Sequence, residues 1–205
     1  MKSALITFEG IEGSGKSTQI ALLAGYLKGK GYPVVQTREP GGTKLGEAIR
    51  SLILHGADHA VSAKAEFFLY LADRAQHMQE VILPELRNNR IVLCDRFTDS
   101  TLIYQGYVRE IGFPDLKMAL SFAADAVVPD ITFVLDMDVK KGLARLKGRK
   151  EKNRLDQESM AFHQKIRDGY LALVQQGQKR FHLIHADQNE ADVFSQIQKV
   201  VDDNL

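Results

Sequence analysis

A glycine-rich segment near the amino end of the chain has the residue types and spacing of a phosphate-binding loop. Residues 10–17 read Gly-Ile-Glu-Gly-Ser-Gly-Lys-Ser and fit the pattern G-x-x-x-x-G-K-[ST]. The glycines let backbone N–H groups turn toward an anion, and a helix starting near Lys16 adds its positive end. We expect Lys16 to reach the β- and γ-phosphates of a nucleotide and the Ser17 hydroxyl to bind Mg²⁺ directly.

The flanking residues distinguish a binding loop from a glycine-rich turn that binds nothing. An apolar run at residues 4–8 precedes the segment, and apolar residues at helical spacing follow it between Ile20 and Leu27. This strand–loop–helix context is the one that the motif requires, so we predict that the loop binds ATP. The predicted contacts are Gly10, Ile11, Glu12, Gly13, Ser14, Gly15, Lys16, Ser17 and Thr18.

The composition is that of an ordinary globular chain. Its 205 residues are 44% hydrophobic and 26% charged, which suits one domain over residues 1–205. The net charge of +1 gives no reason to expect a nucleic-acid or membrane partner, and no segment has the ~20 apolar residues of a membrane span. The single cysteine, Cys94, and the short stretch before the first apolar run predict a cytoplasmic protein without a signal peptide.

Five short apolar runs predict strands, and most of them are continuous, as in strands that are buried on both faces. Helical patterns separate these runs. We therefore predict an α/β P-loop NTPase fold, with a five-stranded parallel sheet flanked by helices and ligands at the carboxyl ends of the strands. The predicted strands are residues 4–8, 33–37, 91–94, 131–135 and 182–185.

Two further segments carry structural predictions. Residues 63–86 form a long apolar helix pattern, for which we predict a buried stripe at helical spacing. Residues 140–154 contain eight Lys or Arg residues and one acidic residue, so we predict a small basic lid at about 140–155; a solvated helix face is the alternative. The predicted stripe consists of Phe68, Leu71, Ala75, Met78 and Ile82, and Phe67 is also expected in the core.

Four other segments are more distinctive than the glycine-rich loop. They read Arg-Glu-Pro-Gly-Gly-Thr at 38–43, Tyr-Leu-Ala-Asp-Arg-Ala-Gln-His at 70–77, Asp-Arg-Phe with Tyr-Gln-Gly at 95–106, and Asn-Arg-Leu-Asp-Gln-Glu at 153–158. With Phe-Glu-Gly at 8–10, this set resembles the thymidylate kinase family over nearly the whole chain. The resemblance implies transfer of the γ-phosphoryl of ATP to dTMP with Mg²⁺, in a homodimer.

The implied reaction needs cationic groups more than a general base. The acceptor phosphate is largely ionised at pH 7, because its second pKa is ~6, so the site must position two polyanions. By the resemblance, Arg96 and Arg50 hold the acceptor phosphate, and Lys16 and Arg96 are catalytic. Arginine suits this task because its planar fork binds phosphate through two hydrogen bonds.

The lid supplies a further arginine. Some thymidylate kinases carry a basic residue inside the phosphate loop, whereas this loop has Glu12 followed by Gly13. The chain therefore resembles the bacterial type with a lid arginine, and we predict that Arg149 contacts the transferring phosphoryl, with Arg145 as the rival. Arg154 is the third arginine of this segment.

Base recognition is predicted from two turns of helix. By the resemblance, Arg74 reaches thymine O4. Tyr70 lies four residues before it on the same helix face, where its ring can stack on the base. The family commonly carries Phe where Tyr70 stands. By the resemblance, Thr101 and Gln105 address the N3 and O4 edge, and Tyr104 crowds the sugar 2′ position, which favours deoxyribose.

The acidic residues have predicted roles near the phosphates. Glu12 is expected to address the dTMP 3′-hydroxyl or nearby backbone, and Asp95 to hold Mg²⁺ through water. Glu39 either joins that water network or pairs with Arg38. Two other functions stay open at this point: a kinase for another nucleoside monophosphate, and a P-loop nucleotide switch, although residues 135–138 read Leu-Asp-Met-Asp and lack the Asn-Lys-x-Asp guanine signature.

Overall fold

Five apolar segments pair into one parallel sheet, since buried strands must satisfy their backbone N–H and C=O groups by pairing with their neighbours. The computed structural model describes residues 3–55, 61–111, 113–146, 154–155 and 158–205. The predicted strands are confirmed, each within one residue at either end, and their order is β2-β3-β1-β4-β5. They are β1 (Ala4–Glu9), β2 (Val34–Arg38), β3 (Ile91–Asp95), β4 (Ile131–Asp136) and β5 (Phe181–His185).

The register of the sheet brings three distant parts of the sequence to one edge. Phe8 of β1 lies opposite Asp95 of β3, and Arg38 of β2 also lies opposite Asp95. Parallel strands end on the same side, so the glycine-rich loop after β1, the segment after β2 and the segment after β3 all leave the sheet together. This edge is where the predicted site residues can meet.

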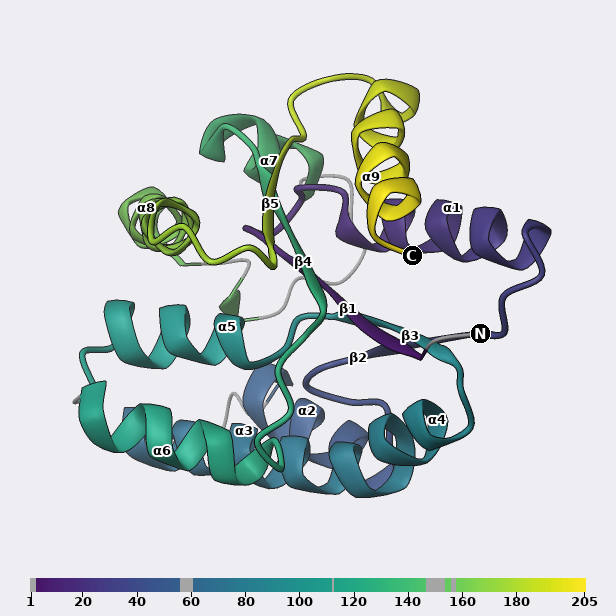
Figure 1. Ribbon diagram of the computed structural model, residues 1–205. Coiled ribbons are helices and arrows are strands. Elements are labelled where there is room, and N and C mark those ends of the chain that lie inside the picture. The colour runs from purple at the N-terminus through teal and green to yellow at the C-terminus, as the bar shows by residue number, and fades with distance from the viewer. Residues whose placement is uncertain (1–2, 56–60, 112, 147–153, 156–157) are drawn as a thin grey trace.

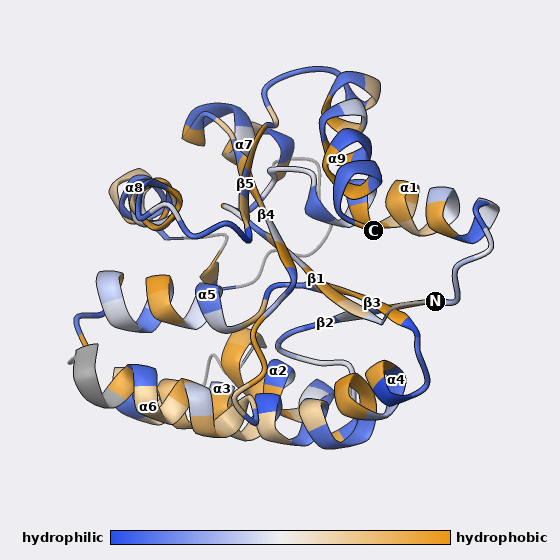
Figure 2. Cartoon of the chain, in the orientation of Figure 1, coloured by the Kyte–Doolittle hydropathy of each residue, from blue (hydrophilic) through white to orange (hydrophobic). Residues whose placement is uncertain are grey.

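Helices cover both faces of the sheet (Figure 1). On one face lie α1 (Lys16–Gly29) and α9 (Glu190–Asn204), which pack against each other. On the other side lies α8 (Met160–Gln175), with α7 (Val139–Leu146) beside it. Figure 2 shows that the central strands are mostly hydrophobic, and their core includes Phe8 and Phe133, whose rings are tilted by 47° with centroids 5.2 Å apart.

The remaining helices form an outer layer on the α8 side of the sheet. Here α2 (Lys44–His55) packs on α3 (Ala63–His77), and α3 packs on α6 (Phe113–Ala123). Between β3 and α6, the short helix α5 (Thr98–Thr101) continues into a π-helical segment, η2 (Leu102–Val108). The segment η2 contacts both α6 and α8, so it connects the outer layer with α8.

The long helix predicted at 63–86 is interrupted by one wide turn. It consists of α3, a π-helical segment η1 (Met78–Ile82) and α4 (Leu83–Arg87). Pro84 lacks an N–H group and its ring crowds the preceding turn, which accounts for the irregular turn directly before it. The helix continues beyond this turn with a shifted phase.

The buried stripe predicted for this helix is wrong in its first half. Phe68 is 55% exposed and Ala75 is also exposed, whereas Met78 and Ile82 are fully buried as predicted. Leu71 is half-buried. The inner face of α3 carries mainly polar residues, which hydrogen-bond to other segments of the chain around the cavity that Tyr70 and Arg74 line. Its buried residues are Glu66, Phe67, Asp73, Arg74 and His77.

The predicted basic lid is described only at its two ends. Its first half forms α7, and Arg154 and Leu155 follow after residues 147–153, which lie outside the described part of the chain, as does Arg149. Among the helices that the structure describes, none combines the length and the apolar character needed to cross a membrane.

Candidate active site

A cavity of about 710 Å³ lies at the carboxyl edge of the sheet, with the glycine-rich loop at one end. Every described residue that the sequence predicts for the site lines it, apart from Gly10 and Ile11 at the base of the loop. The structure therefore brings together in one space the residues that the sequence analysis assigned to ATP and to dTMP. The latter set consists of Glu12, Arg50, Tyr70, Arg74, Arg96, Thr101, Tyr104 and Gln105.

The loop has the backbone of an anion-binding turn. Gly13 and Gly15 have φ of 75° and 97°, in the left-handed region that favours glycine. A Cβ on Gly13 would lie 2.2 Å from the carbonyl oxygen of Gly142, so only glycine lets α7 pack directly on the loop. Since the N-cap of α1 is Gly15, no side chain caps the helix, and its first N–H groups are available to an anion.

Lys16 and Ser17 occupy the first turn of α1. Lys16 is buried, and its Nζ donates to the carbonyls of Gly10 (3.1 Å) and Ile11 (2.9 Å). Burial, assisted by the positive charge of Arg96, lowers the pKa of Lys16 to about 8. A bound polyanion would favour the charged form and raise this pKa again.

Ser17 and Asp95 form a pair of oxygen donors beside the loop. The Ser17 hydroxyl donates to Asp95 Oδ2 at 3.1 Å. The described residues contain no cluster of three or more His, Cys, Asp or Glu side chains that could hold a metal by themselves. The pair thus fits Mg²⁺, which takes few protein ligands and completes its shell with phosphate oxygens and water.

Arg96 lines the cavity and reaches the loop through Glu12. Its Nη2 donates to Glu12 Oε1 at 2.8 Å, and its guanidinium carbon lies 5.1 Å from the centre of the Tyr104 ring. Tyr104 also donates to Glu12, at 2.8 Å. Burial by itself would raise the pKa of Glu12, but Arg96, Lys16 and these hydrogen bonds hold it well below its usual value.

Glu9 hydrogen-bonds to residues beside Arg96, and the sequence analysis assigned it no role. It is fully buried and accepts hydrogen bonds from the backbone N–H of Phe97 (2.9 Å) and the hydroxyls of Ser100 (2.6 Å) and Tyr170 (2.8 Å). Burial and the charge of Asp99 raise its pKa to about 7. The available signal was its position directly before Gly10, at the end of a buried strand.

Arg74 is the centre of the predicted base site. Its side chain is 1% exposed; Nε donates to Glu39 Oε2 (2.8 Å) and Nη2 donates to Thr101 Oγ1 (3.0 Å). Its Nη1 has no hydrogen-bond partner among the described residues. Tyr70, one turn earlier on α3, lines the same cavity.

Glu39 corrects one alternative of the sequence analysis. It does not pair with Arg38, which instead donates to Glu47 at 2.9 Å. Glu39 is buried between Arg74 and His77, whose Nδ1 lies 3.0 Å from Glu39 Oε1. Glu39 therefore orients Arg74. The two residues come from distant segments of the chain, so the neighbours of Glu39 in the sequence do not predict this ion pair.

The remaining predicted residues lie at the two ends of the cavity. Arg50 Nη1 donates to the carbonyl of Pro40 (2.9 Å), and Gln105 Nε2 donates to Glu66 Oε1 (3.0 Å). Arg145 lies beside the phosphate loop, with Nη1 3.4 Å from the Gly13 carbonyl oxygen. Arg154 instead pairs with Glu66. The choice of Arg149 as the lid arginine stays a prediction.

Known proteins are similar to this chain in sequence and in fold. A family model described as thymidylate kinase matches residues 8–197. The chain belongs to the thymidylate kinase family. It is 46% identical over 200 residues to a thymidylate kinase from Halothermothrix orenii (96% of this chain, 95% of that one) and 41% identical over 207 residues to one from Bacillus pumilus (100% and 98%).

The fold agrees with a solved member of this family. The crystal structure of thymidylate kinase from Ehrlichia chaffeensis has a TM-score of 0.81 and 35% identity, over 98% of this chain and 100% of that one. The predicted P-loop α/β fold and the family resemblance are thereby confirmed. The nucleotide switch is not favoured.

Asp73, like Glu9, is a buried acid near this site that does not line the cavity. It is fully buried; Oδ1 accepts from the Gly41 N–H (2.9 Å), whereas Oδ2 has no partner among the described residues. Burial and the neighbouring charge of Glu39 raise the pKa of Asp73 to about 7. The folded protein thus keeps a proton that the unfolded chain loses near pH 4, so stability falls as pH rises from about 4 to 7.

We predict that Asp73→Asn stabilises the protein at alkaline pH, because asparagine keeps the Gly41 contact and resembles the protonated acid. The melting temperature of the variant relative to wild type should rise by about 3 °C or more between pH 5 and pH 8. Asp125→Asn, which changes an exposed aspartate, should show no such trend. If the melting temperature of Asp73→Asn differed from that of wild type by the same amount at both pH values, the raised pKa of Asp73 would be contradicted.

Proposed function

We propose that the phosphoryl transfer of this family, from ATP to dTMP, takes place in the cavity between Lys16 and Arg96. The observation that carries this proposal is that one cavity joins the phosphate loop to a second set of buried or half-buried arginines. A protein that only hydrolyses or senses a nucleotide has no need of arginines beyond the γ-phosphate position. An acceptor that itself bears a phosphate does need them.

The donor end binds ATP through the loop residues 10–18. The N–H groups at the start of α1 face the phosphates, and Lys16 neutralises charge on the β- and γ-phosphates. Ser17 would hold Mg²⁺ directly and Asp95 would hold it through water. When bound, Mg²⁺ withdraws charge from the phosphate oxygens during transfer.

The acceptor end positions dTMP and requires no general base. Arg96 and Arg50 hold the acceptor phosphate, whose attacking oxygen is already ionised. The Glu12 carboxylate holds Arg96 in place and faces the sugar, where Tyr104 narrows the space at the 2′ position. Catalysis then rests on alignment of the two phosphates and on positive charge at the transferring phosphoryl, to which Arg149 contributes from the lid.

The base end selects thymine by hydrogen bonding and stacking. The free Nη1 of Arg74 is suited to donate to O4, where cytosine carries a donor of its own. Tyr70 stacks on the ring, and Thr101 and Gln105 lie along the same edge. The methyl group of thymine contributes less, because one methyl in a pocket is worth only ~1–3 kcal/mol.

The test of this proposal is ADP formation from Mg-ATP with dTMP, dUMP, dCMP, UMP, AMP and GMP offered separately. We expect strong preference for dTMP, weaker use of dUMP and little turnover without an acceptor. A preference for another monophosphate would contradict the assigned base site. Hydrolysis that is indifferent to the acceptor would contradict the assigned acceptor site.

We predict that Arg96→Ala lowers kcat/KM for dTMP by about a hundred-fold or more while the Kd for ATP changes by less than about threefold. The physical reason is that Arg96 contacts the loop only through the Glu12 side chain, whereas the backbone N–H groups at the start of α1 and Lys16 are the groups proposed to hold the ATP phosphates. Steady-state kinetics and ATP titration measure the two quantities. Arg90→Ala, which changes an exposed arginine, should alter neither, and equal loss of ATP and dTMP binding in Arg96→Ala would contradict the acceptor role.

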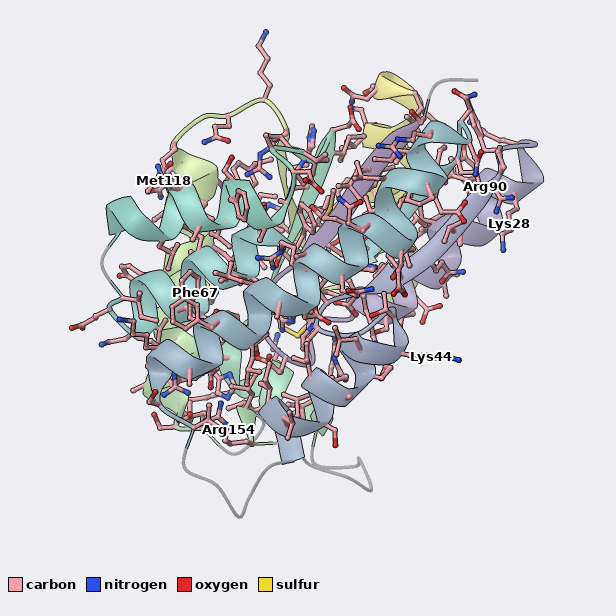
Figure 3. The ribbon with its side chains drawn as sticks, turned by 90° about the horizontal axis from the view of Figure 1, so that it is seen from below. Lys28, Lys44, Phe67, Arg90, Met118 and Arg154 are labelled. Carbon is pink, nitrogen blue, oxygen red and sulfur yellow. The ribbon has the colours of Figure 1, made fainter. Side chains whose placement is uncertain are left out.

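We also infer that the protein is a homodimer, formed through the outer layer of helices. Figure 3 shows α2, α3 and α6 side by side on this face, with Met118 on α6. Figure 2 shows hydrophobic residues along α3 and α6 in this outer layer. An apolar surface of this kind supports an interface between copies. The exposed apolar side chains on these helices are Leu45, Leu52, Phe68, Met118 and Phe122.

A charge on this face should separate the two copies. Phe122 is 88% exposed, so Phe122→Asp is expected to leave the fold intact and to yield a 22.9 kDa monomer, where wild type has twice that mass. Light scattering after size exclusion measures the mass. Leu205→Asp, at the end of the chain, should stay dimeric. A monomeric wild type, or a dimeric Phe122→Asp, would contradict this interface.

The cellular location is proposed from chemistry alone. Cys94 is a free and buried cysteine, which suits a reducing compartment, and ATP is the phosphoryl donor. We therefore place the enzyme in the cytoplasm, with ATP and dTMP as its small-molecule partners and no nucleic-acid or membrane partner.

A further inference from the structure

Glu66 is a buried carboxylate beside the base site that the mechanism above does not use. It lies on the inner face of α3, is 2% exposed and does not line the cavity. Its Oε1 accepts a hydrogen bond from Gln105 Nε2 at 3.0 Å. Burying a carboxylate is costly unless it is paired, so its partners indicate what it does.

Two arginines face the Glu66 carboxylate. Arg154, from the end of the basic segment, pairs with Oε2, and Arg109 Nε lies 3.7 Å from Oε1. Figure 3 labels Arg154 at the end of the molecule where α3 begins and where Phe67, the neighbour of Glu66, also lies. An ionised carboxylate only accepts hydrogen bonds.

The charge of Glu66 decides which way the Gln105 amide points. Because Glu66 can only accept, the NH₂ group of Gln105 must face it, and the amide oxygen must point the other way. Gln105 lines the cavity, so its oxygen is presented to the bound base. An oxygen at this place accepts from thymine N3–H and repels cytosine N3, which is itself an acceptor.

We propose that Glu66 is a specificity-determining positioning residue: it holds the Gln105 amide with its oxygen toward N3 of the base and so excludes cytosine. This inference rests on the proposed base site and adds a second selection at N3 to the one that Arg74 makes at O4. Removing the charge of Glu66, rather than its shape, should therefore change base selection.

Glu66→Gln tests the proposal with a nearly isosteric change. The new amide places its oxygen toward Arg154 and its NH₂ group toward Gln105, so the Gln105 amide turns over and presents NH₂ to the base. We expect kcat/KM for dTMP to fall by about ten- to a hundred-fold, while kcat/KM for dCMP is unchanged or higher and the KM for ATP stays constant. The dTMP to dCMP ratio within one variant does not depend on how much of the enzyme is folded.

Two comparisons separate this role from a structural one. Glu158→Gln removes a carboxylate that also pairs with Arg109 but does not touch Gln105, so it should leave the ratio unchanged. In a Gln105→Ala background, Glu66→Gln should no longer alter the ratio, because its effect passes through Gln105. Should Glu66→Gln give no soluble enzyme, Glu66→Ala is expected to lower the ratio in the same direction.

An unchanged ratio in Glu66→Gln, or a change that persists without Gln105, would overturn the proposal. Failure of the proposed base site is a different result: wild type itself would then not prefer dTMP over dCMP. Wild-type selectivity is therefore measured first.

Discussion

The parallel pairing of β1 with β3 holds the two halves of the active site at a fixed distance. Beyond the paired strands, the Arg96 N–H donates to the Phe8 carbonyl (3.0 Å), and the Phe97 N–H donates to the Glu9 carboxylate (2.9 Å). The phosphate loop begins directly after Glu9, and Arg96, which we propose holds the acceptor phosphate, follows β3 directly. Neither segment can move without breaking buried hydrogen bonds, so the donor and acceptor ends keep their separation.

The cavity contains more buried charge than stability alone would favour. A buried ion pair often contributes little to stability, since the loss of hydration offsets the attraction. Here each pair directs a polar group at the cavity, so its value lies in preorganisation of the site before substrate arrives. The carboxylates come from the loop after β1, the segment after β2 and the inner face of α3. The ion pairs are Glu12 with Arg96 and Glu39 with Arg74, and the Glu66 carboxylate accepts a hydrogen bond from the neutral amide of Gln105.

The need for buried hydrogen-bonding groups around the cavity explains why the inner face of α3 is polar. A helix that lines a substrate cavity buries residues for their hydrogen bonds, and the apolar residues of α3 are then left for its outer face. Phe68 was predicted in the core and lies outside it for this reason. The same outer face is available to a second copy of the chain, so the site and the proposed dimer interface lie on opposite sides of one helix.

Local patterns in the sequence determined the five strands, the phosphate loop with Lys16 and Ser17, and the arginines that line the cavity, because each depends on neighbouring residues or on spacing along one element. The tertiary structure alone decided which carboxylate meets which donor. Glu12 and Arg96 are 84 residues apart, and Glu66 and Gln105 are 39 apart. Such pairs form only when the strand order and the packing of α3 bring separate segments to the carboxyl edge of the sheet. A local sequence pattern cannot predict these contacts, because they join residues far apart in the chain.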